Sequence, residues 1–145
     1  MRVALISDTR LPTLPDGGHG LGMSAHDIAR GLSLRGYDVT MFAGPGSAFE
    51  HGRLVTYTRE PDIDNALEAD GSDYDAILDT SHFHRLSKQH PDLPVLNRIC
   101  DTECDWQPPN TVVNSPFMQA RYGGRLVNTG IDVGAIPFCA DPARA

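Results

Sequence analysis

Glycines are concentrated in one stretch of the sequence, residues 15–22 (PDGGHGLG), which precedes a helical pattern. Glycine lets the backbone approach a ligand closely. The first turn of the helix that follows presents free N–H groups and partial positive charge, which suit a phosphate or a sugar hydroxyl. The stretch therefore predicts a ligand-binding loop, and the alternative is a flexible loop whose glycines merely permit turns.

Two common nucleotide motifs do not fit this glycine stretch. A dinucleotide site needs G-x-G-x-x-G directly after the first strand, whereas here the glycines come well after Ser7 and position 23 is Met. A P-loop needs Gly-Lys-Ser or Gly-Lys-Thr, and neither occurs in the sequence. The glycines therefore do not indicate a nicotinamide cofactor or a P-loop nucleotide, and we expect no cofactor.

Histidines and cysteines form the other group with chemical potential. His82 and His84 are two positions apart and Cys100 and Cys104 are four apart, so neither pair has the short C-x-x-C spacing of a zinc site. We expect no metal, and we interpret these residues as loop side chains and small buried thiols. A Cys–His nucleophilic pair would require the fourth and fifth strands to be neighbours, which the sequence leaves open.

Trp106 stands in an acidic loop after the fifth predicted strand. Its indole ring could stack on a sugar, because aromatic faces pack against sugar rings. The alternative is a side chain that covers part of the core.

Periodic patterns place these residues on alternating strands and helices. Residues 2–7 are a nearly continuous apolar run, typical of a strand buried on both faces. A helix is predicted from a cap at Ser24 to a stop at Gly36, because apolar residues recur at i, i+3, i+4 and i+7. Further strands are predicted at residues 37–43, 53–57, 75–80, 95–99, 111–114 and 126–129, and further helices at 61–69, 84–89 and 116–122.

This alternation predicts an α/β fold. Parallel strands need right-handed crossovers, and the crossovers place helices on both faces, so we expect a Rossmann-like, doubly wound, mostly parallel sheet. With 145 residues the chain has the length of one domain, and residues 1–145 are assigned to it.

Charge and composition exclude several classes of function. The net charge of -7, without a cluster of Lys and Arg, disfavours nucleic acid as a partner. No apolar run is long enough to span a membrane, and the N-terminal residues lack the pattern of a signal peptide. The three cysteines cannot all pair, which fits a reducing cytoplasm.

Three stretches of the sequence resemble one family. They are GGHGLGMSAHDIARGLSLRGYDVTMFAG at residues 17–44, YDAILDTSHFH at 74–84 and VVNSPFMQARYGGRLVNTGIDVGAIPF at 112–138. In this order they are similar to the N-terminal, acceptor-side domain of family-4-type GT-B glycosyltransferases. The resemblance covers nearly the whole chain, and it implies that the fold is a single GT-B half.

The resemblance also implies site residues. The family's glycine loop contacts the donor pyrophosphate across a cleft between two domains, and a histidine after its fourth strand lies beside the transferred sugar. Carried onto this chain, the catalytic residue is His82. The residues implied to bind donor phosphate or acceptor are Gly17, Gly18, His19, Gly20, Thr80 and His84.

The family continues into a second domain that holds the nucleotide sugar, and this sequence stops at Ala145. The resemblance therefore implies the acceptor half of a retaining hexosyltransferase, inactive alone because one domain could hardly bind the donor or exclude water. Its implied partners are a nucleotide sugar, a sugar acceptor, and either a separate C-terminal half or a second copy in a homodimer. The alternative is a non-catalytic sugar- or nucleotide-binding or regulatory module derived from that fold.

Overall fold

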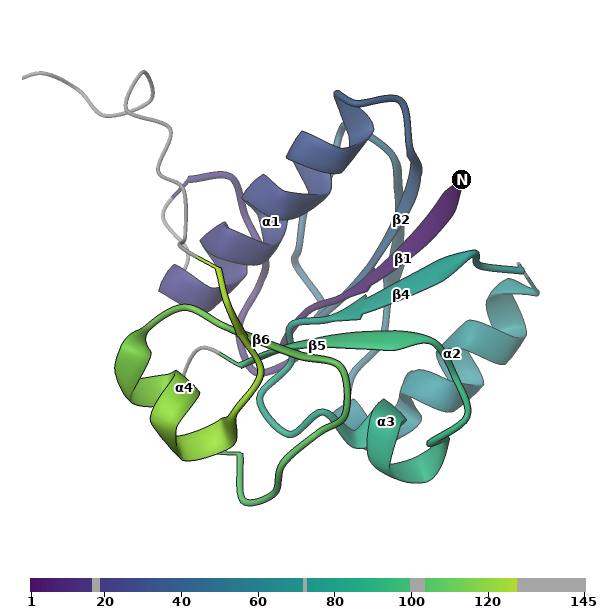
Figure 1. Ribbon diagram of the computed structural model, residues 1–145. Coiled ribbons are helices and arrows are strands. Elements are labelled where there is room, and N and C mark those ends of the chain that lie inside the picture. The colour runs from purple at the N-terminus through teal and green to yellow at the C-terminus, as the bar shows by residue number, and fades with distance from the viewer. Residues whose placement is uncertain (17–18, 72, 100–103, 128–145) are drawn as a thin grey trace, which may run out of the picture.

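The computed structural model describes residues 1–16, 19–71, 73–99 and 104–127 (Figure 1). Within them the chain forms one sheet with the strand order β3-β2-β1-β4-β5-β6-β7, and each pairing is parallel. The strands are β1 (Arg2–Ile6), β2 (Asp38–Ala43), β3 (Arg53–Thr56), β4 (Ala76–Asp79), β5 (Val95–Ile99), β6 (Thr111–Val113) and β7 (Arg125–Leu126). The predicted Rossmann-like, doubly wound sheet is therefore confirmed.

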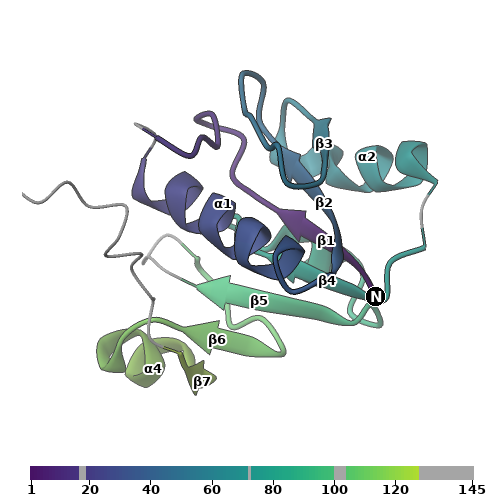
Figure 2. The same cartoon turned by 90° about the horizontal axis from the view of Figure 1, so that it is seen from above.

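Helices cover both faces of the sheet. The described helices are α1 (Gly20–Ser33), the short 3₁₀ helix η1 (Glu60–Asp62), α2 (Ile63–Asp70), α3 (Arg85–Gln89) and α4 (Pro116–Tyr122). The side chains of α1 pack on one face, and those of α2, α3 and α4 pack on the other (Figures 1 and 2). This division follows from right-handed crossovers that run in opposite directions from the centre of the sheet.

Helix α1 starts earlier than the sequence pattern predicts. His19 caps the helix, because its Nδ1 atom accepts a hydrogen bond from the backbone N–H of Gly22 at 3.4 Å. The predicted cap at Ser24 is wrong, since this residue already lies inside the helix. The predicted stop is confirmed, because Gly36 follows the helix with a φ of +82°, a backbone conformation that favours glycine.

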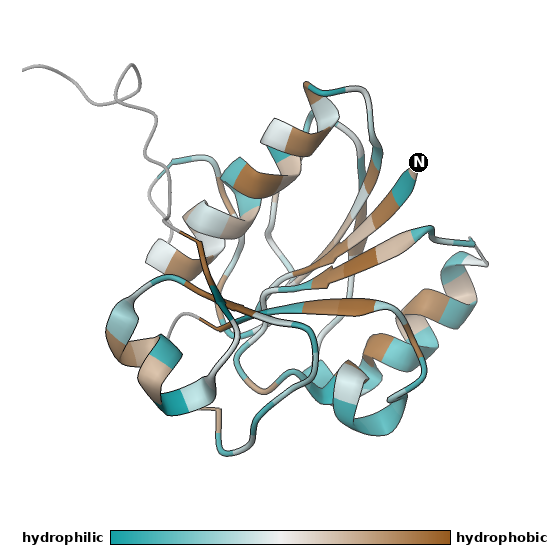
Figure 3. Cartoon of the chain, in the orientation of Figure 1, coloured by the Kyte–Doolittle hydropathy of each residue, from teal (hydrophilic) through white to brown (hydrophobic). Residues whose placement is uncertain are grey.

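The strands alternate their side chains between two apolar layers. On the α1 side, Leu5 and Met41 pack against Ala25 and Ala29. On the other side, residues of four strands meet α2 and α3; this cluster includes Ala4, Ile6, Phe42, Ile77, Val95, Ile63 and Leu86. Figure 3 shows the apolar colouring concentrated in the strands. Each fully buried large side chain contributes about 1.5–3 kcal/mol, so this alternation specifies the register.

The strand order reverses between β1 and β4. From β1 the chain builds β2 and β3 outward, and it then crosses back to β4 to build the other half of the sheet. The loops that leave β1 and β4 therefore diverge at the carboxyl edge of the sheet. In open α/β sheets this switch point is where ligands bind.

Candidate functional site

A buried carboxylate lies directly after β1. Asp8 is 3% exposed, and it is held from three directions. The Nε2 atom of His82 lies 3.0 Å from its Oδ2 atom, the Nε atom of Arg10 donates to the same oxygen at 3.1 Å, and the backbone N–H of Arg10 donates to Oδ1 at 3.0 Å. The loop after β4 is thus tied to the end of β1.

The pKa of Asp8 reflects this environment. Burial by itself raises the pKa of the carboxyl group, because it disfavours the charged form. The hydrogen bonds from His82 and Arg10 outweigh burial and hold the pKa of Asp8 well below its usual range. Asp8 is therefore a fixed negative charge at neutral pH, next to an imidazole.

A second carboxylate–histidine pair lies at the end of β4. The Nδ1 atom of His84 is 3.6 Å from Oδ1 of Asp79, and both side chains are 1% exposed. The same oxygen accepts hydrogen bonds from the backbone N–H of Ser81 at 2.9 Å and from its hydroxyl at 2.6 Å. His84 has a φ of +48°, which is uncommon for a residue other than glycine. Such strain concentrates at functional sites because the surrounding structure must hold it.

Glu60 and Trp106 fix the loop that carries both histidines. The Oε1 atom of Glu60 accepts a hydrogen bond from the backbone N–H of Phe83 at 3.3 Å, and the indole Nε1 of Trp106 donates to the carbonyl of Phe83 at 3.1 Å. Burial raises the pKa of Glu60, and the negative charges of Asp79 and Asp8 raise it further, against the lowering effect of its contacts with Ser81 and Phe83.

Thr80 and Tyr57 bind the backbone at the end of β1. The Thr80 hydroxyl donates to the carbonyl of Ile6 at 2.8 Å, and the Tyr57 hydroxyl donates to the carbonyl of Ser7 at 2.9 Å. Burial raises the pKa of Tyr57 well above 10, and the negative charges of Asp79, Glu60 and Asp8 act in the same direction. The cluster of three carboxyl groups thus creates a negative field at the switch point.

The structure brings some predicted site residues together and separates others. His82, Thr80 and His84 lie in one loop at the carboxyl edge, whereas His19 and Gly20 stand at the start of α1. Within the described part of the chain, neither His19 nor Gly20 hydrogen-bonds to the Asp8 cluster. Gly17 and Gly18 lie outside the described residues, so the predicted glycine loop stays a prediction.

The remaining candidates from the sequence fall into the core or outside the described residues. Strands β4 and β5 are neighbours, as the Cys–His pair required, but Cys100 lies outside the described residues. Cys104 is buried and packs with Tyr122, and Trp106 packs against the same cluster. Among the described residues no three His, Cys, Asp or Glu side chains gather as a metal ion would require.

Sequence reasoning missed all three carboxyl groups of this site, Asp8, Asp79 and Glu60. A signal was available for Asp8, because it follows a buried apolar strand directly, as Asp79 ends another. Carboxyl ends of parallel strands share one edge of the sheet, so both carboxylates had to lie there. Glu60 offers no comparable signal, because it opens the short helix η1 and does not directly follow a buried strand.

Comparison with known proteins yields a limited likeness. No family model matches the chain, and no curated protein matches it. Among solved structures, the C-terminal domain of the Coenzyme A biosynthesis bifunctional protein CoaBC is similar in fold, with 16% sequence identity and a TM-score of 0.48. The match covers 70% of this chain, and the chain spans 65% of that domain's length. At this level the likeness concerns the fold alone.

The expected membership of the GT-B glycosyltransferases is wrong. The similar structure is not a glycosyltransferase, and no glycosyltransferase family matches. The predicted function as an acceptor half depended on that membership and is therefore wrong. The alternative, a sugar- or nucleotide-binding module derived from the same fold, loses its support for the same reason. The physical reason lies in the matched residues: Gly36 ends a helix, and Val39 and Met41 are buried in a strand. Such residues indicate a strand–helix–strand unit, and proteins with many unrelated functions contain this unit.

None of the described helices could span a membrane. Within the described ranges, each helix is too short or too polar to cross a bilayer.

Proposed function

We propose that the chain is an enzyme that transfers a proton to or from a small polar substrate at the carboxyl ends of β1 and β4, with His82 as the catalytic acid–base. The observation that carries this proposal is the contact of 3.0 Å between His82 and the buried carboxylate of Asp8. Histidine is the side chain whose ordinary pKa best suits proton transfer near neutral pH.

The position of the pair supports a substrate site. Asp8 and His82 lie where the strand order reverses, and there the loops after β1 and β4 diverge. The side chain of His82 is 11% exposed, so it stands at the rim of the buried cluster. A group in this position can touch a ligand and still be shielded from most of the solvent.

Asp8 acts as the residue that positions His82. When a carboxylate accepts a hydrogen bond from one ring nitrogen, it fixes the ring orientation and stabilises the imidazolium that forms on proton uptake. Nε2 contacts Asp8 and Nδ1 is buried, so a substrate exchanges a proton with the ring only after a covering side chain moves aside. The Arg10 side chain lies on the same carboxylate and is about half exposed, so a substrate that displaces it reaches the pair.

The charges of the cluster indicate the chemical class of the substrate. Asp8, Asp79 and Glu60 lie there, and their negative charges add to the effect of burial in raising the pKa of Tyr57. A ligand with an ammonium group or several hydroxyl donors is favoured in such a field, and a polyanion is disfavoured. Amines and amino acids are therefore the classes to test first.

The binding step is tested by amide NMR with a panel of these metabolites. We expect a ligand that shifts the backbone signals of Thr9, Arg10, Ser81 and Phe83, and we expect Asp8→Asn to weaken its binding. His90→Gln serves as the control, because His90 lies at the end of α3 and is exposed. If every ligand that binds shifts signals elsewhere and leaves these four unchanged, the proposal is overturned.

We also propose the reducing cytoplasm as the compartment of this reaction. The sequence holds three cysteines, and a protein with an odd number of cysteines fits a reducing compartment. Mass spectrometry of the native protein should find all three thiols reduced. A disulfide between Cys100 and Cys139 would contradict this assignment.

A further inference from the structure

Within the described residues, no helix covers one half of the sheet on the side where α1 packs. Leu78 of β4 is paired with Leu96 of β5, and Arg98 of β5 is paired with Val112 of β6, so these side chains project to the same face. Helix α1 packs over β1 and β2 on that face. Among the described helices, α2, α3 and α4 pack on the opposite face, so none of these three covers β5 and β6 here.

The exposed fractions of the side chains show that this face of the sheet is only partly covered. Leu5 on β1 is fully buried beneath α1, whereas Leu96 is 42% exposed and Val127 is 49% exposed. Scattered apolar side chains are ordinary on a protein surface, but these border a cavity of about 230 Å³ between α1 and the strands. The cavity is lined by Ser24, Ile28, Leu78, Leu96, Arg98, Val112, Val113 and Val127.

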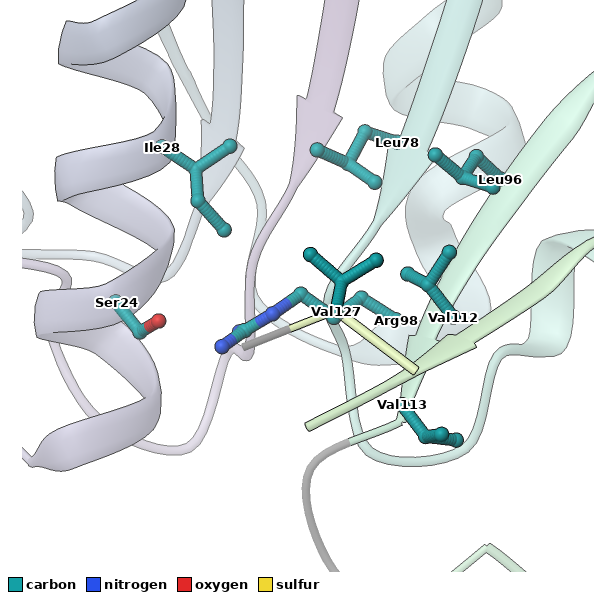
Figure 4. Close-up of a pocket in the computed structure, with 8 residues that line it drawn as sticks. All are labelled: Ser24, Ile28, Leu78, Leu96, Arg98, Val112, Val113 and Val127. Carbon is teal, nitrogen blue, oxygen red and sulfur yellow. The ribbon is translucent and has the colours of Figure 1, made fainter. Parts of the chain in front are cut away.

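Arg98 is the one charged side chain in this lining. Figure 4 shows its guanidinium group reaching across the cavity toward Ser24 on α1, with Leu96 and Val112 on the strand side. Its Nη1 atom is shielded from solvent. A guanidinium group carries five N–H donors in a planar fork, so it can hold a carboxylate and still serve another acceptor.

We propose that this cavity binds a small amphipathic anion, a medium-chain carboxylate, whose apolar chain lies on Leu78, Leu96 and Val112 and whose carboxylate meets Arg98 and Ser24. Charge complementarity selects the anion, because a cation set in an apolar lining attracts a negative group that brings its own apolar body. The volume agrees with this size of ligand, since a cavity of about 150 Å³ already accommodates benzene.

This site is distinct from the proposed proton-transfer site. Leu78 and Asp79 are consecutive residues of β4, so they project to opposite faces of the sheet. The first borders the cavity, and the second belongs to the buried carboxylate cluster. Either proposal can therefore fail without the other.

Octanoate is the probe that tests the cavity, and octanol is its neutral counterpart. Titration of methyl-labelled protein should shift the methyl signals of Ile28, Leu78, Leu96 and Val112 in a saturable manner. Octanoate should bind at least tenfold more tightly than octanol, because the carboxylate gains charge-assisted hydrogen bonds that the alcohol lacks. Sedimentation during the titration checks that the chain does not change its oligomeric state.

Matched variants assign the charge effect to one side chain. Arg98→Met should weaken octanoate binding at least tenfold and change octanol binding less than twofold. Arg35→Met removes the same charge from an exposed position just after α1 and should leave both affinities unchanged. Leu96→Asp places a competing carboxylate beside Arg98 at an exposed position, and it should abolish octanoate binding while the fold is retained.

Three results would overturn the proposal. Methyl shifts outside the cavity would place the ligand elsewhere. Equal losses of octanoate affinity in Arg98→Met and Arg35→Met would show that the effect comes from the net charge of the protein and not from Arg98. Dimerisation that removes the cavity signals without any ligand would show that a second copy of the chain covers this face instead.

Discussion

Nε2 of His82 lies 3.0 Å from Oδ2 of Asp8, so a contact between the β4–α3 loop and the end of β1 joins distant parts of the sequence. The contact pairs an imidazole with a carboxylate that is almost fully buried. Two consequences follow: the pair contributes to stability in a pH-dependent manner, and it orients the ring for proton transfer.

Asp8→Asn should change the acid stability of the protein. A carboxyl group whose folded pKa is lowered stabilises the fold above its unfolded pKa of about 3.9, and this contribution is lost as the pH falls toward the folded value. We expect the variant to be about 2 kcal/mol less stable at pH 7 and to lose less stability between pH 5 and pH 2. Urea unfolding across this range measures both effects.

The control for this experiment is Asp38→Asn. Asp38 is exposed and faces Arg2 at 3.7 Å, and such surface pairs contribute about 0–1 kcal/mol. Parallel pH profiles for wild type and Asp8→Asn would contradict the role assigned to the buried contact.

His26 should make stability depend on pH in a higher range. Burial lowers the pKa of His26, because removal of the ring from water disfavours its charged form. The unfolded state therefore takes up a proton first, and stability falls as the pH drops through about 6.5. His26→Leu should flatten the unfolding free energy between pH 7 and pH 5. If the unfolding free energy of His26→Leu falls as steeply as that of the wild type between pH 7 and pH 5, the role assigned to His26 is wrong.

Gly44→Ala should be destabilising, because Gly44 touches the chain just after Asp8. A Cβ atom at Gly44 would lie 2.7 Å from the carbonyl oxygen of Thr9, so one of the two backbones must move. We expect a loss of about 1–3 kcal/mol in the free energy of unfolding. Gly20→Ala is the matched control, since its Cβ would meet nothing within 4 Å and alanine favours a helix. Equal stabilities of the two variants would refute the close approach.

Trp106→Phe should loosen the loop that carries His82 and His84. The substitution removes the indole donor from the Phe83 carbonyl and keeps an aromatic ring in the core cluster. The expected cost is about 1 kcal/mol, with faster amide hydrogen exchange in residues 81–84 and little change in β2. Lys88→Ala, which removes only a cation above the same ring, should leave that exchange unchanged.

The fold could be predicted from the sequence because its central strands are buried on both faces. Residues such as Leu5 and Ile6 must be apolar whichever way they point, and Gly36 must accept a positive φ to end a helix. The start of α1 escaped prediction because the cap is His19, which is not among the preferred capping residues.

The candidate site could be predicted only in part. His82 and His84 stand out as side chains after a strand, but their carboxylate partners depend on which strands are neighbours. Asp8 meets His82 because β1 lies beside β4, and this strand order is a property of the topology rather than of any local pattern. The resemblance to glycosyltransferases misled for the same reason, since it rested on residues that shape a helix end and a buried strand.

The most direct test of the central claim is the conversion of metabolites by the chain itself. A pool of amines and amino acids in deuterated water is followed by proton NMR with wild type, His82→Gln and His90→Gln. We predict that wild type and His90→Gln convert or deuterate at least one compound, and that His82→Gln does so at least about 100-fold more slowly. Equal rates in His82→Gln and wild type, or no conversion by wild type, would contradict the assignment of His82 as the catalytic acid–base.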